Sequence, residues 1–333
     1  MEHIGASPLR PLLRILEPAF REHTTRIEEH EAWRTFDEKS ARRLAQLGFF
    51  HARDLCFEYA NGEGPRAHWP LLSQFFEEAA GRLQDFAFTA SLGFQGGSTL
   101  ELWRNLNGED ASFVEGDRVL AFGRGENPKG LGRLDETFLV GAAALVANAP
   151  RATHFIGLAE VKGQATLLAF ARDEAVITEE LTPRLPGFFT GSAGELALHG
   201  AEVLADDIKL SGVALGEILS AHQELEHLIL ASVALGAINA LSEKDQFPLL
   251  RVRLSLEGII ALQREACYGD APRYLNDFQL VSRELLLQLP EALREAGNSA
   301  AAAKLARDLS ALPLLCPWLS HAASTSKREA QVG

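Results

Sequence analysis

The stretch "ETFLVGAAALVANAPRATHFIGLAE" (residues 136–160) decides the fold of this 333-residue chain. A short apolar run at 138–140 is interrupted by Gly141, and a second run at 145–146 leads into the turn-forming residues 148–150. Another β-type run follows from there. The pattern predicts a strand, a turn and a returning strand, so we expect β-structure in the middle of the chain.

Similar patterns extend on both sides of this stretch. Runs such as "RVLAFG", "QATLLAFA" and "GELALHG", separated by Gly, Pro, Asn and Asp, are typical of a small β-barrel or sandwich. The flanking segments instead show apolar residues at helical spacing. We therefore expect an α+β protein with an N-terminal helical domain (1–110), a middle β-domain (111–212), a C-terminal helical bundle (213–320) and a polar, disordered tail (321–333).

Two local signals refine the first helices. Pro18 lies inside a helical pattern, which predicts a kink or a break there. The next helical segment, "DEKSARRLAQLGFF", reaches Gly48, which fits the glycine position just after a helix end.

Composition narrows the class of protein. Hydrophobic residues are 47% and charged residues 23%, which is ordinary for a globular chain of about two domains or one large layered domain. The net charge of −13 argues against nucleic acid or an anionic membrane as a partner, and an anionic ligand would need a local basic site.

Sequence features also indicate a compartment. No signal-peptide pattern and no run of about 18 apolar residues are found. Cys56, Cys267 and Cys316 are widely spaced, which fits a reduced protein without a disulfide framework or a zinc site. We expect a cytoplasmic protein with no bound metal.

Two segments contain residue types found in phosphate-binding or metal-binding sites, the loop "FGRGENPKGLGR" (122–133) and the segment "HQELEH" (222–227). The first lacks the Lys-Ser/Thr pair of a phosphate loop and the helix of a dinucleotide fingerprint. It is either a flexible connection or a ligand-lining loop in which Lys129 and Arg133 meet an anion.

The spacing of the two histidines in "HQELEH" does not suit zinc. Ser98 and Ser192 lack the G-x-S-x-G elbow of a serine hydrolase.

Glu226 is the candidate general base. It lies at the wet end of an almost entirely apolar stretch, "LEHLILASVALGAINAL" (225–241), which predicts a buried helix. Desolvation there would raise its pKa toward the range of a useful base. Alternatively, Glu224 and Glu226 are favourable charges in the first turns of a helix.

Four stretches together resemble the acyl-CoA dehydrogenase family. They are "RRLAQLGFF" with "YANGEG", "FLVGAAALVANAPRATHFIGLAE", "TGSAGELALHGAEVLADDI" and "LEHLILASVALGAINAL". They occur in the family's order and near its spacing, over about residues 12–310. The resemblance implies a helix–β–helix fold with FAD bound partly across a subunit interface.

The resemblance also implies a reaction and its residues. In the family a glutamate removes a proton from Cα of an acyl-CoA while hydride leaves Cβ for the flavin, and Glu226 matches the base position of some members. Ser192 falls in the third stretch, and we assign it to substrate binding together with Lys129 and Arg133.

The family's cofactor contacts, however, are degenerate here. Leu145 and Ala147 stand where the family has Trp and Thr, and Lys244 and Phe247 stand where it has Arg and Phe before a glycine that is missing. "GRGENPKG" replaces "TEPxxGSD", and the late "GGxGY" has no counterpart. Losing an aromatic ring and a hydroxyl removes stacking and hydrogen bonds together.

Three interpretations remain open, of which we favour the first. In the first, the chain is a subunit that dehydrogenates a bulky acyl-CoA, such as a steroid side-chain thioester, only with a related chain that completes the FAD site. In the second, it is an independent homo-oligomeric dehydrogenase. In the third, it is a flavin-free scaffold or acyl-CoA-binding module. The expected partners are an acyl-CoA, a homologous subunit or second copy, and an electron-transfer flavoprotein.

Overall fold

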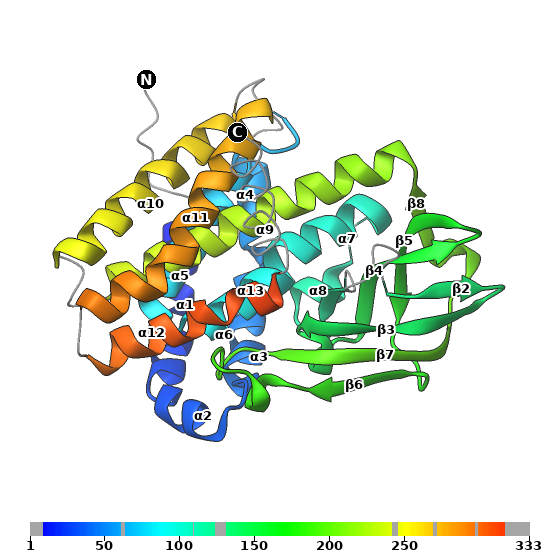
Figure 1. Cartoon of the computed structure of the whole chain (residues 1–333), viewed down its shortest axis with the longest axis horizontal. Helices are drawn as coiled ribbons and strands as arrows, with labels where there is room; N and C mark the ends of the chain where they lie inside the picture. Colours follow the sequence, from blue (N-terminus) through cyan, green and yellow to red (C-terminus); the bar gives the residue numbers. More distant parts are fainter. Residues whose placement is uncertain are drawn as a thin grey trace, which may run out of the picture.

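Helices, then strands, then helices follow one another along the chain, as the sequence predicts (Figure 1). The structure, a computed structural model, describes residues 9–60, 64–108, 110–123, 131–241, 246–268, 272–296 and 299–316. The expected tail at 321–333 lies outside these ranges. None of the helices described is long and apolar enough to cross a membrane.

The N-terminal segment is a set of packed helices. They are α1 (Leu9–Thr24), α2 (Ile27–Trp33), α3 (Glu38–Gln46), α4 (Ala52–Tyr59), α5 (Trp69–Leu83), α6 (Phe86–Gly93), α7 (Leu100–Asn107) and α8 (Ala111–Val114), with the π-helical turn η2 (Phe94–Thr99) joining α6 to α7.

Pro18 lies inside α1, and Gly48 follows the end of α3. α1 continues through Pro18, so there is no break; its buried face, which includes Leu13, Leu16 and Phe20, offsets the hydrogen bond that proline removes. α3 ends as expected, because Gly48 follows it with φ +92°, the left-handed conformation that glycine adopts readily.

The middle segment forms one mixed sheet. Its strands are β1 (Leu120–Gly123), β2 (Arg133–Asp135), β3 (Phe138–Ala147), β4 (His154–Val161), β5 (Gln164–Ala171), β6 (Val176–Glu180), β7 (Ala193–Glu202) and β8 (Ile208–Ser211). They lie in the order β6-β7-β3-β2-β4-β5-β8, with β1 parallel to β4. Side chains from both halves of the sheet, such as Leu139, Phe155 and Leu196, share a small core of their own.

The stretch 136–160 forms β3, a turn at Asn148 and β4, as predicted. Asn148 has φ +62°, which asparagine tolerates better than most residues. Gly141 does not interrupt β3. A glycine is needed at this position because the backbone of a neighbouring segment passes close to it. A Cβ placed on it would lie 2.1 Å from the carbonyl oxygen of Leu131, so only glycine allows the two backbones to approach.

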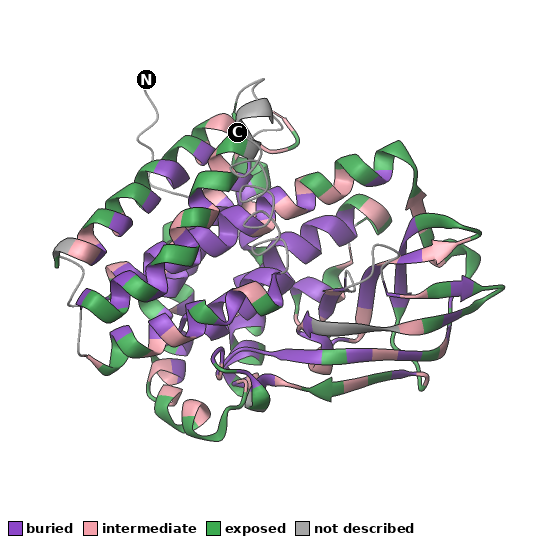
Figure 2. Ribbon diagram, viewed as in Figure 1, coloured by how far each residue is buried: buried purple, intermediate pink, exposed green. Residues whose placement is uncertain are grey.

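The C-terminal segment is built around one long helix. Its helices are α9 (Val213–Asn239), α10 (Phe247–Ala266), α11 (Pro272–Ala296), α12 (Ala300–Ser310) and α13 (Leu312–Leu315). α9 is buried almost without interruption from Leu225 to Ile238, as predicted, and lies against α5 and α6 (Figure 2). The main hydrophobic core contains residues of both helical segments and of the sheet.

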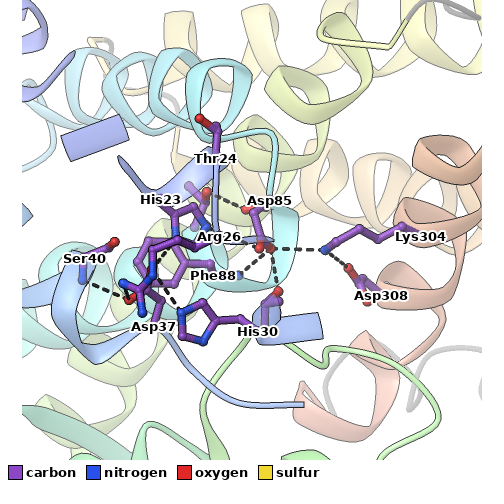
Figure 3. A network of polar contacts seen from close by, with 12 residues as sticks. His23, Thr24, Arg26, His30, Asp37, Ser40, Asp85, Phe88, Lys304 and Asp308 are labelled. Carbon is purple, nitrogen blue, oxygen red and sulfur yellow. Dashed lines mark hydrogen bonds and ion pairs between the residues drawn. The ribbon is translucent and has the colours of Figure 1, made fainter. Parts of the chain in front are cut away.

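A buried ionic network crosses that core (Figure 3). The ring of His23 on α1 lies 3.1 Å from Asp37 Oδ2 and 3.4 Å from Asp85 Oδ2, and stacks on Phe88. Lys304 of α12 lies 3.4 Å from Asp85 Oδ1 and 3.1 Å from Asp308 Oδ2. The network therefore connects α1, α6 and α12 by charge.

The same carboxylates also bind the segment just before β7. Thr190 Oγ1 donates to Asp85 Oδ1 at 2.6 Å, and the backbone N–H of Phe188 donates to Asp308 Oδ1 at 3.0 Å. Burial alone would raise the pKa of Asp85, but Lys304 and His23 outweigh it and hold that pKa well below its ordinary value. Asp85 is therefore an ionised link between three parts of the chain.

Candidate functional site

The carboxyl end of β3, where the degenerate cofactor positions Leu145 and Ala147 fall, leads into a turn that is hydrogen-bonded to α6. Asn148 donates through Nδ2 to the carbonyl of Ser91 at 2.9 Å and through its backbone N–H to the carbonyl of Ser192 at 2.8 Å. The backbone N–H of Ser192 in turn donates to Ser91 Oγ at 2.9 Å. Ser192, predicted to bind substrate, is thus fully buried in the joint between the sheet and α6.

The helix α13 lies against β3 at this end (Figure 1). Leu312, Leu315 and Cys316 are buried there in the main core, and Ala147 packs against the same core. The strand that carries the degenerate cofactor positions Leu145 and Ala147 is therefore in contact with α13 of the same chain.

Most of the other predicted site residues lie outside the part of the chain that the structure describes. Lys129 and Lys244 lie outside the described residues, and the same holds for the side chains of Leu145 in β3 and Phe247 at the start of α10. Arg133 is exposed on β2, where it pairs in register with Val140 and Glu160. The substrate role of Arg133 stays a prediction.

Glu224 and Glu226 lie on nearly opposite sides of α9, because residues two apart on a helix are rotated by about 200°. Glu226 is half-buried, and its role as the base stays a prediction. Glu224 is buried, with its Oε2 at 2.8 Å from Arg66 Nη2 and its Oε1 accepting from Ser220 Oγ at 3.1 Å.

Burial raises the pKa of Glu224, and Arg66 only partly offsets this. The Arg66–Glu224 contact is short, yet Glu224 Oε2 has no well-aligned hydrogen bond, so it is an ion pair by distance alone. The alternative that Glu224 is a charge in the first turns of a helix is wrong, because α9 begins at Val213.

A cleft of about 1070 Å³ opens beside this ion pair, between α4, α7, the first turns of α9 and the end of α10. Arg53 Cζ lies 4.7 Å from the ring centre of Phe57, and Arg66 Cζ lies 5.3 Å from that of Trp69. Both cations and both rings line the cleft.

The wall of the cleft holds a second ion pair. Arg53 Nε donates to Glu101 Oε2 at 2.7 Å, and His68 Nε2 lies 3.4 Å from the same oxygen. Burial alone would raise the pKa of Glu101, but His68 and Arg53 outweigh it and lower that pKa to about 2. The cleft was missed from sequence; the pairs Arg53/Phe57 and Arg66/Trp69, at spacings of four and three residues, were its only local signals.

Comparison with known proteins rests on structure. No protein-family model and no curated protein sequence matches the chain. Butyryl-CoA dehydrogenase from Megasphaera elsdenii aligns with 94% of this chain and 95% of its own, at a TM-score of 0.69 and 17% identity. The ChsE4-ChsE5 complex from Mycobacterium tuberculosis aligns over 99% and 98%, at a TM-score of 0.64 and 16% identity. KijD3 in complex with FMN and a dTDP-sugar aligns over 99% and 95%, at a TM-score of 0.68 and 16% identity.

The chain has the acyl-CoA dehydrogenase fold. Flavin cofactors are named for solved structures of this fold, among them a glutaryl-CoA dehydrogenase from Mycobacterium smegmatis in complex with FADH2 (TM-score 0.63, 15% identity, 93% of this chain and 94% of that one). The described residues at the end of β3 do not fit a flavin ring. The side chain of Ala147 offers neither a ring nor a hydrogen-bonding group, and α13 lies against the strand.

Within the described ranges, no group of three or more His, Cys, Asp or Glu side chains could hold a metal ion.

Proposed function

We propose that this chain is a subunit of an acyl-CoA dehydrogenase-type complex in which a related partner chain completes the FAD site. The complex would carry out α,β-dehydrogenation of an acyl-CoA thioester. The observation that supports this proposal is the seating of α13 against the carboxyl end of β3, where the cofactor contact is an alanine. The retained fold supports a role within the same kind of assembly.

Within this proposal Glu226 stays the candidate base. Its place on α9, half-buried and on the other side from the Arg66–Glu224 ion pair, leaves its carboxylate outside that pair. A carboxylate in a partly desolvated setting is the kind of group that removes a proton next to a thioester carbonyl.

A second candidate function is a flavin-free scaffold or acyl-CoA-binding subunit that contributes no catalytic group. The joint of Ser91, Asn148 and Ser192 favours it, because the backbone of Ser192, predicted to bind substrate, is hydrogen-bonded there and its side chain is buried.

Co-expression with a family member that keeps the Trp, Thr and "TEPxxGSD" contacts tests the proposal. We expect the two chains to co-purify, to carry flavin, and to dehydrogenate an acyl-CoA that neither chain turns over alone. Turnover by the partner alone at the rate of the complex would favour the scaffold, and failure to co-purify would contradict both candidates.

A further inference from the structure

The cleft between α4, α7, α9 and α10 has no part in the proposed function. Its volume of about 1070 Å³ is large enough for a small organic molecule, since ligand pockets commonly measure about 300–1000 Å³. It lies beside Glu224, on the side of α9 that faces away from Glu226.

Hydrogen-bond donors face this cleft without enough acceptors. Arg53 uses Nε for Glu101 and Nη1 for Asp54, whereas its Nη2 makes no hydrogen bond to a described residue. The indole N–H of Trp69 is buried and, among described residues, has no acceptor. Arg66 is held by Glu224 through a short but poorly aligned contact. The ligand should therefore bring an acceptor-rich group.

The charge of that group follows from the aromatic rings. The faces of Phe57 and Trp69 are already covered by guanidinium groups, so an amine ligand would meet like charges where it would seek a ring. The acids in contact with these cations are already engaged, Glu101 and Asp54 with Arg53 and Glu224 with Arg66. Glu217, a further lining residue, is exposed. Planar carboxylates match the fork geometry of arginine.

The remainder of the cleft is apolar. Ile218 and Ala221 of α9 form one wall, Leu210 and Ala266 extend it, and the exposed ring of Tyr268 stands at the rim. An aliphatic chain of a ligand would lie along this wall and remove both its own surface and the wall from water.

We propose that this cleft binds an amphipathic monocarboxylate, with its carboxylate on Arg66 and Arg53 and its apolar body along α9. The ligand class is an organic acid with an aliphatic or alicyclic body. Binding displaces Glu224 as the main partner of Arg66.

Calorimetric titration of the full chain with dodecanoate, and with dodecan-1-ol as the uncharged match, tests the proposal. We expect dodecanoate to bind at least about tenfold more tightly than the alcohol, since hydrogen bonds between charged groups are stronger than those of a neutral hydroxyl. The double variant Arg66→Gln/Glu224→Gln, which leaves no unpaired buried charge, should lose that preference. Arg118→Gln, at an exposed arginine away from the cleft, should keep it.

A second variant guards against a folding artefact. Ala221→Trp fills the cleft without touching its charges, so it should abolish binding of both probes while the melting temperature stays within a few degrees. Equal affinity for acid and alcohol, unchanged affinity in Ala221→Trp, or no binding of dodecanoate would each overturn the proposal. None of these results depends on flavin content or acyl-CoA turnover.

Discussion

Asp85 connects more parts of the molecule than any local pattern around it suggests. Its carboxylate accepts from the backbone N–H of Phe88 at the start of α6 and from Thr190 before β7, and it faces His23 and Lys304. Breaking a buried ion pair by removing one charge is expensive, because the remaining charges stay buried without compensation.

We therefore expect Asp85→Asn to lower the free energy of unfolding by about 3 kcal/mol at neutral pH. Since the folded-state pKa of Asp85 is depressed, this contribution is present above about pH 4 and shrinks as the pH falls below it. Urea unfolding of both proteins between pH 7 and pH 3 measures the difference. Glu179→Gln, which breaks an exposed pair with Arg184, is the control and should cost less than about 1 kcal/mol.

The two glutamates of α9 allow a matched comparison at the level of residues. In the complex with a flavin-holding partner, Glu226→Gln should lower turnover at least about a hundredfold, because it removes basicity but keeps size. Glu224→Gln should leave turnover within a few-fold, since Glu224 lies on the other side of the helix beside Arg66. Steady-state turnover rates of both variants, measured on matched preparations of the complex, distinguish the two residues. A large loss of turnover only in Glu224→Gln would make Glu224 the base. Unchanged turnover in both variants would place the base on the partner chain.

Among the elements, α9 depends on close packing against α5. A Cβ on Gly236 would lie 2.0 Å from the carbonyl oxygen of Glu77, so the backbone of α5 occupies the space that a side chain would need. Gly236→Ala should therefore destabilise the protein by about 1–3 kcal/mol. Gly258 of α10 has open space around it, and Gly258→Ala should instead stabilise by about 0.5–1 kcal/mol. Thermal unfolding of the pair measures both; equal shifts would contradict the packing.

Elements with a long apolar run were predictable, whereas short elements and sites built from distant residues were not. The apolar stretch of α9 and the runs of β3 and β4 carry their own signals over many residues. β2 and β8 are too short to show alternation, and Gly141 was interpreted as a break although a neighbouring backbone explains it. The cleft escaped prediction because Arg53, Arg66 and Ala221 are far apart in sequence and meet only through packing. The domain boundaries stay a prediction.

For the whole molecule, the outer faces of α10 and α11 indicate self-association or a partner. Leu254, Leu262, Leu280 and Leu287 are exposed there, which is unusual for side chains of this size gathered on two helices (Figure 2). We predict an obligate oligomer. Light scattering at micromolar concentration should show no monomer, and Leu280→Glu/Leu287→Glu should produce one, whereas Ile177→Glu on the sheet should not. A stable wild-type monomer would contradict this prediction.

Binding of FAD to the purified chain measures most directly whether this chain can hold a flavin by itself. Equilibrium dialysis of the chain alone against FAD, followed by measurement of protein-bound flavin, gives the stoichiometry. Because α13 lies against β3 and the contact position is Ala147, we predict far less than one FAD per chain at micromolar FAD, with stoichiometric binding only in the complex with a partner chain. One tightly bound FAD per chain in the isolated protein would contradict the account.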